Sequence, residues 1–242
     1  HEWAQIAWQA GMRYAVITTK HHDGFCLFDS QLTDYKAPNT PARRDLIREF
    51  VDAFRAAGFK IGFYYSLIDW HHPEFPIDGL HPQRDDVEFR EREKHRDIRT
   101  YAEYLHGQVR ELLTNYGKID IMWLDFSYPN RDWGWSRGKG REDWQSENLV
   151  AMIRELQPEI LLNNRADVPG DFHTPEQVVP REWVQVDGKP VVWEACHTFS
   201  GSWGYHRDEA SWKSVDMLVC LLVDTVSKGG NLLLNVGPTA RG

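Results

Sequence analysis

The stretch LIREFVDAFRAAGFKIGFYYS, residues 46–66, contains one complete helix-to-strand unit. Its first part predicts an amphipathic helix, because apolar residues recur there at helical spacing. These residues are Leu46, Ile47, Phe50, Phe54 and Ala57. Gly58 is expected to end the helix, since the residue that closes a helix often adopts a left-handed conformation that glycine reaches without strain. The β-rich run over residues 61–66 then predicts a strand.

Similar units lie on both sides of this stretch. Gly11 and Gly117 each follow a helical pattern and lead to predicted strands at residues 14–19 and 119–125. A fourth helix ends at Pro158 and leads to a strand at residues 160–163. Further on, we expect a short strand at 191–194, a long helix near 211–227 and a last strand at 232–236. Helices that alternate with single strands predict an α/β fold with a parallel sheet.

An open doubly wound sheet and a closed (β/α)8 barrel both fit this alternation. The dinucleotide-binding open sheet needs a G-x-G-x-x-G turn after its first strand, and only Gly138-Lys139-Gly140 comes near it, in a polar loop. The predicted strands instead end in polar and aromatic residues, as at the active-site end of a barrel. We therefore expect residues 1–242 to form one partial catalytic domain, a TIM-like (β/α)8 barrel that lacks its first strand because the sequence opens on a helix.

Composition excludes several classes of partner. The 242 residues carry a formal net charge of −8 without a basic cluster, which argues against nucleic acid. The longest strictly apolar run, residues 217–223, is far shorter than the roughly 20 residues of a membrane-spanning helix, so no membrane partner is expected. Cys26 and Cys220 lie in apolar contexts and are expected to be buried. The oligomeric state and the choice among periplasmic, secreted and cytoplasmic locations stay open.

Asp125 is the first candidate catalytic residue. Alternate residues of a strand share a face, so Ile119, Ile121 and Trp123 point the same way as Asp125. A carboxylate at the end of such an apolar face is partly desolvated, which suits a nucleophile or a base. The alternative is an aspartate that caps the turn after the strand.

Cleavage of a glycosidic bond would require a second carboxylate, which protonates the leaving oxygen. Two glutamates are candidates: Glu176, in the irregular stretch that follows the strand at 160–163, and Glu194, at the end of the strand at 191–194. Isolated glutamates often have structural roles instead.

Other polar and aromatic residues suit the binding of a sugar. His21 and His22 are better placed to hydrogen-bond hydroxyl groups than to bind a metal, because adjacent strand residues point apart and neither H-x-H nor H-E-x-x-H occurs. A core or turn role is their alternative. Arg165 suits the orientation of a carboxylate or a structural salt bridge. Trp203 suits stacking on a sugar ring or filling of the core.

Taken in order along the chain, these motifs resemble the α-L-fucosidases of glycoside hydrolase family 29. The most specific are His-His-Asp-Gly-Phe at residues 21–25 and Asn-Leu-Leu-Leu-Asn-Val-Gly-Pro at 231–238. The others are Arg44-Asp45-Leu46, Gly62-Phe63-Tyr64-Tyr65-Ser66, Asp69-Trp70, Trp123-Leu124-Asp125, Asn163-Asn164-Arg165, Trp193-Glu194 and Ser202-Trp203-Gly204-Tyr205.

The resemblance implies an exo-glycosidase that removes terminal α-linked L-fucose from a fucosylated glycan. It implies retention of configuration and a covalent fucosyl-enzyme. We expect neither a metal nor another cofactor. Asp125 matches the nucleophile. Glu176 matches the acid/base of several bacterial members and is our expectation, while Glu194 matches the position proposed in animal relatives. The positions that match sugar-binding or nucleophile-flanking residues are His21, His22, Tyr64, Trp123, Arg165 and, near the C6 methyl group, Trp203.

Two parts of the family pattern are missing from this sequence. One is a first strand that ends in a His-Trp-Gly type motif, and the other is the C-terminal β-sandwich domain that usually follows the barrel. Two alternative functions stay open: another retaining barrel glycosidase, or a fucose-binding fragment without catalysis.

Overall fold

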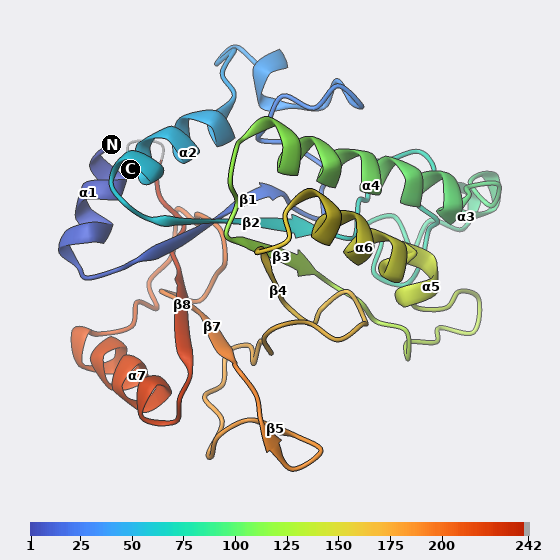
Figure 1. Ribbon diagram of the computed structural model, residues 1–242. Helices are drawn as coiled ribbons and strands as arrows, with labels where there is room; N and C mark the ends of the chain where they lie inside the picture. The colour runs from blue at the N-terminus through green and yellow to red at the C-terminus, as the bar shows by residue number, and fades with distance from the viewer. Residues whose placement is uncertain (240–242) are drawn as a thin grey trace. The chain divides into compact units, whose positions relative to one another are not determined.

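The computed structural model describes residues 1–239 of the chain (Figure 1). The chain divides into two compact units, His1–Pro169 and Gly170–Gly242. The first contains a four-stranded parallel sheet, and the second contains a parallel and an antiparallel pair of strands. The predicted α/β class with a parallel sheet is confirmed.

The sheet of the first unit has the strand order β1-β2-β3-β4. Its strands are β1 (Tyr14–Lys20), β2 (Lys60–Ser66), β3 (Ile121–Asp125) and β4 (Leu161–Leu162). Each begins and ends within two residues of its predicted run. All pairings are parallel, so the carboxyl ends of the four strands lie at one edge of the sheet. In this register Tyr64 lies opposite Trp123, and Ser66 lies opposite Asp125.

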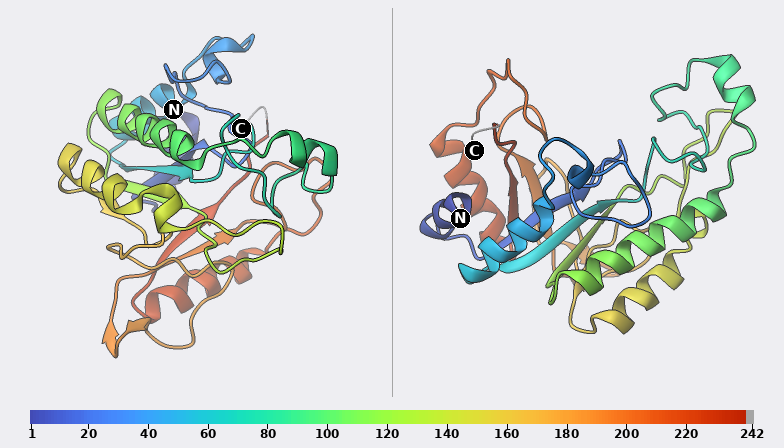
Figure 2. Two further views of the ribbon diagram at one scale, coloured as in Figure 1. Left: turned by 90° about the vertical axis from the view of Figure 1, so that its right-hand side faces the viewer. Right: turned by 90° about the horizontal axis from the view of Figure 1, so that it is seen from above.

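One α-helix precedes these strands, and five α-helices and a short 3-10 helix, Ala37–Asn39, connect them. The α-helices are α1 (Glu2–Gln9), α2 (Leu46–Ala56), α3 (Val87–Arg92), α4 (Ile98–Asn115), α5 (Arg141–Trp144) and α6 (Ser146–Leu156). Helix α2 begins after Asp45, whose side chain accepts a hydrogen bond from the Arg48 backbone N–H at 2.9 Å. It ends before Gly58, whose φ of +87° confirms the predicted left-handed stop. Helices α4 and α6 lie side by side (Figure 2).

The core of the first unit is formed by apolar side chains of its helices and strands. Fully buried members are Ile47, Phe63, Tyr65, Leu105, Val109, Met122, Leu149 and Ile153. Cys26 is also buried, as expected, and burial raises the pKa of its thiol to about 11. This thiol therefore stays protonated at neutral pH and is a poor nucleophile.

In the second unit, the strands β7 (Glu194–Thr198) and β8 (Asn231–Asn235) pair in parallel, and α7 (Val215–Ser227) lies between them in the chain. The strands β5 (Gln185–Val186) and β6 (Lys189–Pro190) form a hairpin. The predicted strand at 191–194 is wrong, because β7 begins only at Glu194. Residues 191 and 193 pair elsewhere: the Val191 N–H donates to the Val184 carbonyl at 3.0 Å, and Trp193 forms a bridge with His173.

The expected burial of Cys220 is also wrong. Cys220 lies in α7 and is exposed, together with the neighbouring apolar residues Met217, Val219, Leu222 and Val223. The apolar context of a residue in the sequence did not predict its burial in this helix.

The strands of residues 1–239 form three separate hydrogen-bonded sheets, and a closed barrel is not seen among them. Within the same residues, the helices are all too short or too polar to cross a membrane.

Candidate active site

Six predicted site residues of the first unit come together at the carboxyl edge of the sheet. His21 and His22 follow β1, Tyr64 lies in β2, Trp123 and Asp125 lie in β3, and Arg165 follows β4. Each strand thus supplies at least one functional side chain to this edge. Such an arrangement is expected where parallel strands end at one side of a sheet.

Asp125 is the buried centre of this cluster, with only 7% of its surface exposed. One carboxylate oxygen lies 2.9 Å from Arg165 Nη1, and the other accepts a hydrogen bond from the Tyr64 hydroxyl at 2.6 Å. Both oxygens are thus directed to side chains of other strands, rather than to the turn after β3. An ionised carboxylate in this position is stabilised by one cation and one hydroxyl donor.

A stack of planar groups surrounds the carboxylate. The His21 and Tyr64 rings stack with centroids 5.6 Å apart and planes 8° from parallel. Tyr64 stacks on Trp123 at 5.7 Å, and the Arg165 guanidinium carbon lies 4.5 Å above the Trp123 ring. These contacts hold both partners of Asp125 in fixed orientations.

His22 is tied to β2 by Ser66, and this contact determines which imidazole nitrogen carries the proton. The Ser66 hydroxyl donates to the Ile68 carbonyl at 2.8 Å, so its oxygen is an acceptor toward His22 Nδ1, which lies 2.6 Å away. We therefore assign the proton of the neutral ring to Nδ1, which leaves Nε2 as an acceptor. A hydroxyl group of a ligand would be a suitable donor to Nε2.

Both histidines are uncharged at neutral pH. Burial lowers the pKa of His22 to about 4, and the adjacent His21 adds to this shift. Partial burial lowers the pKa of His21 as well, against the opposing effect of the Asp125 charge. The charge of Asp125 is therefore balanced by Arg165 and not by an imidazolium.

A buried ion pair holds the loops around this site. Lys20 Nζ lies 3.2 Å from Asp69 Oδ2, and the side chains of both residues are almost fully buried. The other Asp69 oxygen leaves no room at Gly24, where a Cβ would lie 2.2 Å away. The Trp70 N–H also donates to the His22 carbonyl at 2.8 Å, so the loops after β1 and β2 are joined directly.

Sequence reasoning assigned no role to Lys20, Ser66 or Phe126. Phe126 follows Asp125 with a φ of +86°, which is unfavourable for a residue with a side chain. Polar side chains at strand ends were the signal for the site, but no pattern in the sequence distinguishes Ser66 from other strand-end residues. The positive φ of Phe126 has no sequence signal.

Asp125 and Arg165 line a cavity of about 720 Å³. Phe126, Tyr128 and Asn164 also line it. The cavity therefore combines a carboxylate, a guanidinium and aromatic side chains, the groups that bind the hydroxyls and apolar faces of sugars.

The remaining predicted residues lie in the second unit. Glu176 is exposed and lies in an extended segment next to β7, where the Gln177 N–H donates to the Cys196 carbonyl at 2.9 Å. Glu194 is buried at the start of β7, with 4% of its surface exposed. Trp203 is 40% exposed, and its carbonyl accepts from the Asn235 side chain.

The fold and the first unit's site define a parallel α/β protein built around a buried carboxylate and suited to a sugar ligand. The family model for Alpha-L-fucosidase matches residues 1–242. The chain belongs to the α-L-fucosidase family, as its motifs indicated.

Relatives from bacteria and animals agree with this assignment. The α-L-fucosidase isoenzyme 1 from Paenibacillus thiaminolyticus is 54% identical with a TM-score of 0.91, and the match covers 100% of this chain and 58% of that one. The α-fucosidase of Thermotoga maritima, solved in complex with a mechanism-based inhibitor, is 37% identical with a TM-score of 0.75 and coverages of 98% and 50%. Plasma α-L-fucosidase of Homo sapiens is 30% identical, over 100% of this chain and 49% of its own length. The chain thus spans about half the length of the curated relatives it matches.

Proposed function

We propose that the protein hydrolyses terminal α-linked L-fucose from glycans, with retention of configuration and through a covalent fucosyl-enzyme. The observation that carries this proposal is Asp125, a buried carboxylate held by Tyr64 and Arg165 and facing a cavity. Membership of the α-L-fucosidase family supports fucose as the sugar.

In the proposed reaction, Asp125 attacks the anomeric carbon of fucose and forms an ester with it. The bond between this carbon and the leaving oxygen breaks, and the acid/base residue gives its proton to that oxygen. The same residue then takes a proton from water, which attacks the anomeric carbon and releases Asp125 as a carboxylate. We propose Glu176 as this acid/base, with Glu194 as the alternative.

The sugar-binding roles follow from chemistry that the site provides. His22 offers Nε2 as an acceptor for one hydroxyl group, and neutral His21 offers a second hydrogen-bonding group. Arg165 and Tyr64 hold the nucleophile, and Trp123 supports both of them. We assign Trp203 to the apolar C6 methyl group, as the motif match implies.

The proposal also includes a barrel. We propose that the parallel strands are parts of a (β/α)8 barrel within one catalytic domain. Support comes from the functional side chains at the carboxyl edge of the first sheet, which is the active-site end of barrel enzymes.

Covalent trapping tests the function and the nucleophile together. The protein is incubated with a 2-deoxy-2-fluoro-fucosyl fluoride, and the intact mass and the labelled peptide are measured. We expect one adduct on Asp125 and none on an Asp125→Asn variant. A panel of aryl glycosides then shows whether fucose is preferred over other sugars. Absence of both adduct and aryl fucoside hydrolysis, in a protein that circular dichroism shows to be folded, would overturn the proposal.

A further inference from the structure

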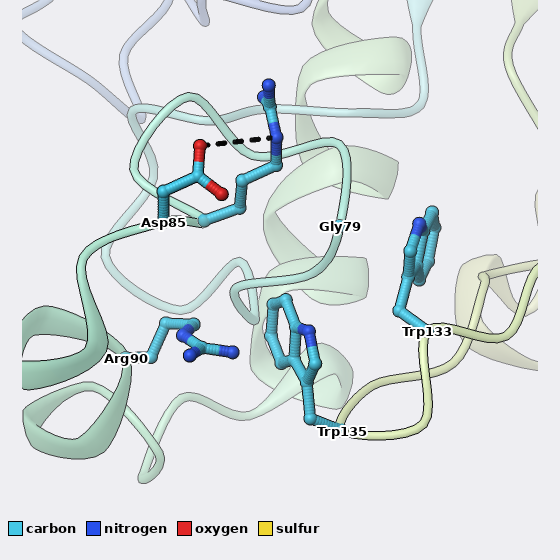
Figure 3. A pocket seen from close by; sticks show the side chains of 6 residues that line it. Gly79, Asp85, Arg90, Trp133 and Trp135 are labelled. Carbon is cyan, nitrogen blue, oxygen red and sulfur yellow. Dashed lines mark ion pairs between the residues drawn. The ribbon is translucent and has the colours of Figure 1, made fainter.

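A second cavity in the first unit, of about 430 Å³, is unassigned by the proposed reaction. We call it the tryptophan cavity, after two of its lining residues. It is lined by Gly79, Arg84, Asp85, Arg90, Trp133 and Trp135 (Figure 3).

The tryptophans of this cavity are held by a tight turn. Asp132 and Arg137 form an antiparallel bridge, and the Trp133 N–H donates to the Ser136 carbonyl at 3.0 Å. Gly79 lies flat against the Trp133 indole, because a Cβ there would come within 2.2 Å of the ring. The Trp133 indole is thus positioned by the fold before any ligand arrives.

A buried ion pair fixes the two loops that form the cavity. Lys139 pairs with Asp78, and the Tyr128 hydroxyl donates to the same Asp78 oxygen at 2.6 Å. Asp78 is next to Gly79 in the chain, while Tyr128 and Lys139 flank the tryptophan turn. The loops after β2 and β3 are therefore tied together directly beside the tryptophan cavity.

The same loops also line the Asp125 cavity. Leu80 and Tyr128 line that cavity, and each belongs to one of the two loops. A row of aromatic contacts leads from the site to the tryptophan cavity: His22 to Phe126 at 5.1 Å, Phe126 to Tyr128 at 5.5 Å, and Tyr128 to Trp133 at 6.2 Å. The two cavities are therefore lined by the same pair of loops, whose aromatic rings contact one another from one cavity to the other.

The charge in the tryptophan cavity is positive, although the whole chain carries −8. Arg84 and Arg90 face a single carboxylate, Asp85, and the Arg84–Asp85 contact is long, at 3.9 Å. The Arg90 guanidinium carbon lies 4.1 Å above the Trp135 ring, toward which it points in Figure 3. Its Nε is buried and has no hydrogen-bond partner among residues 1–239.

We propose that the tryptophan cavity binds the sugar next to the fucose and prefers a pyranose that carries a carboxylate or a sulfate group. The exposed Trp135 indole provides a stacking face for the ring, and Arg90 pairs with the anionic group. This inference rests on the proposed function, since it names the part of the substrate beyond the cleaved bond.

Kinetics on matched substrates test the preference. Three fucosyl disaccharides are compared whose second sugar is a neutral hexose, the corresponding hexuronic acid, or the 6-sulfated hexose. We expect kcat/KM to favour at least one anionic substrate by roughly tenfold, the size of one charge-assisted hydrogen bond. Arg90→Gln should remove most of this preference and leave hydrolysis of a simple aryl fucoside within about twofold. The comparison of uronate with sulfate identifies the anionic group.

Arg92→Gln is the matched control, because Arg92 lies on the same helix with a side chain that is 65% exposed and paired with Glu93. It should keep the preference of the unaltered protein. Equal kcat/KM for neutral and anionic substrates, or a preference unchanged by Arg90→Gln, would contradict the proposal.

A binding measurement separates this inference from the proposed function. Saturation-transfer NMR on the full chain compares a methyl glucuronide and a 6-sulfated methyl glucoside with the neutral methyl glucoside. We expect an anionic glycoside to bind, and Arg90→Gln and Trp135→Ala to weaken it by roughly tenfold. Hydrolysis of aryl fucoside without anionic binding overturns the inference alone. Anionic binding without any fucoside hydrolysis overturns the proposed function and leaves the anionic sugar site standing.

Discussion

Two carboxylates at the same edge of the first sheet pair with basic side chains, but their surroundings differ. Asp69 lies 3.2 Å from Lys20, and the two side chains are 2% and 0% exposed. Asp125 lies 2.9 Å from Arg165, and these side chains are 11% and 19% exposed. Asp125 also lines a cavity of about 720 Å³. The comparison shows that a charge pair enclosed by protein holds loops together, whereas one that borders a cavity is available for chemistry.

The partners of the enclosed pair support this distinction. Lys20 Nζ also lies 3.2 Å from the Ile68 carbonyl and 3.4 Å from the Tyr101 hydroxyl. The Tyr65 ring lies 4.5 Å from the same ammonium group. Because protein groups surround the Lys20 ammonium group on several sides, a substrate cannot reach it.

The largest expected effect comes from removal of the Asp125 charge. Asp125→Asn keeps the shape of the side chain but removes the nucleophile, and we expect kcat/KM to fall on the order of 10⁴-fold or more. Circular dichroism and gel filtration should show a folded protein. An Asp125→Asn variant that hydrolyses an aryl fucoside at a tenth of the normal rate would place the nucleophile elsewhere.

Removal of the Lys20 charge should act on stability instead. Lys20→Met leaves the buried Asp69 carboxylate without its cation, which should lower the free energy of unfolding by about 3–5 kcal/mol. Urea denaturation measures this change. Lys118→Met is the control, because Lys118 forms an exposed pair with Glu159, and it should leave the urea midpoint unchanged. Equal midpoints for the two variants would contradict the structural role of Lys20.

Two neighbouring tyrosines of β2 test the same contrast between the Asp125 site and the enclosed interior, with a smaller expected effect. The Tyr64 hydroxyl donates to Asp125 at 2.6 Å, and the Tyr65 hydroxyl donates to the buried Gln108 side chain at 2.8 Å. Tyr64→Phe should lower kcat/KM roughly ten- to hundredfold, because a hydrogen bond to a charged acceptor is lost. Tyr65→Phe should leave kcat/KM nearly unchanged and lower the free energy of unfolding by about 1 kcal/mol. The reverse outcome would mean that Tyr65 supports catalysis and that Tyr64 only supports the fold.

Local periodicity explains what the sequence predicted correctly. Alternation along residues 119–125 placed Trp123 and Asp125 on one face, and both contact Tyr64 in the structure. The helix-to-strand units predicted all four strands of the first sheet, and the ends of each strand lie within two residues of the predicted ends. These features depend on residues that are close together in the chain, so they can be predicted from the local sequence pattern.

Features that depend on distant partners were not predictable in this way. Lysines are rarely enclosed, so nothing in the sequence marked Lys20 as buried against a residue 49 positions away. The link between His22 and Ser66 spans 44 positions and depends on the register of β1 and β2. The start of β7 was misplaced for a related reason, because the pairing of Val191 with Val184 overrides its strand-like local sequence.

The last test concerns His22 and the dependence of stability on pH. The pKa of His22 is about 4 in the folded protein, against an ordinary value of 6.5. Well above pH 6.5 the imidazole is neutral in both states. As the pH falls from about 6.5 toward 4, the unfolded chain takes up a proton that the folded chain does not. The free energy of unfolding should therefore fall by up to roughly 1.4 kcal/mol per pH unit from this group.

His22→Asn removes this titration and keeps a donor near Ser66. Urea denaturation of both proteins at pH values between about 4.5 and 7.5 should show that the unaltered protein loses stability faster on acidification than the variant does. The difference between the two slopes isolates His22, since the carboxylates contribute to both. Parallel slopes would mean that the pKa of His22 is the same in the folded and the unfolded chain, so that the ring takes up a proton in both states as the pH falls. Below about pH 6.5, Asp125 would then be balanced by an imidazolium as well as by Arg165, and the contrast with the enclosed Asp69 would have to include a second cation.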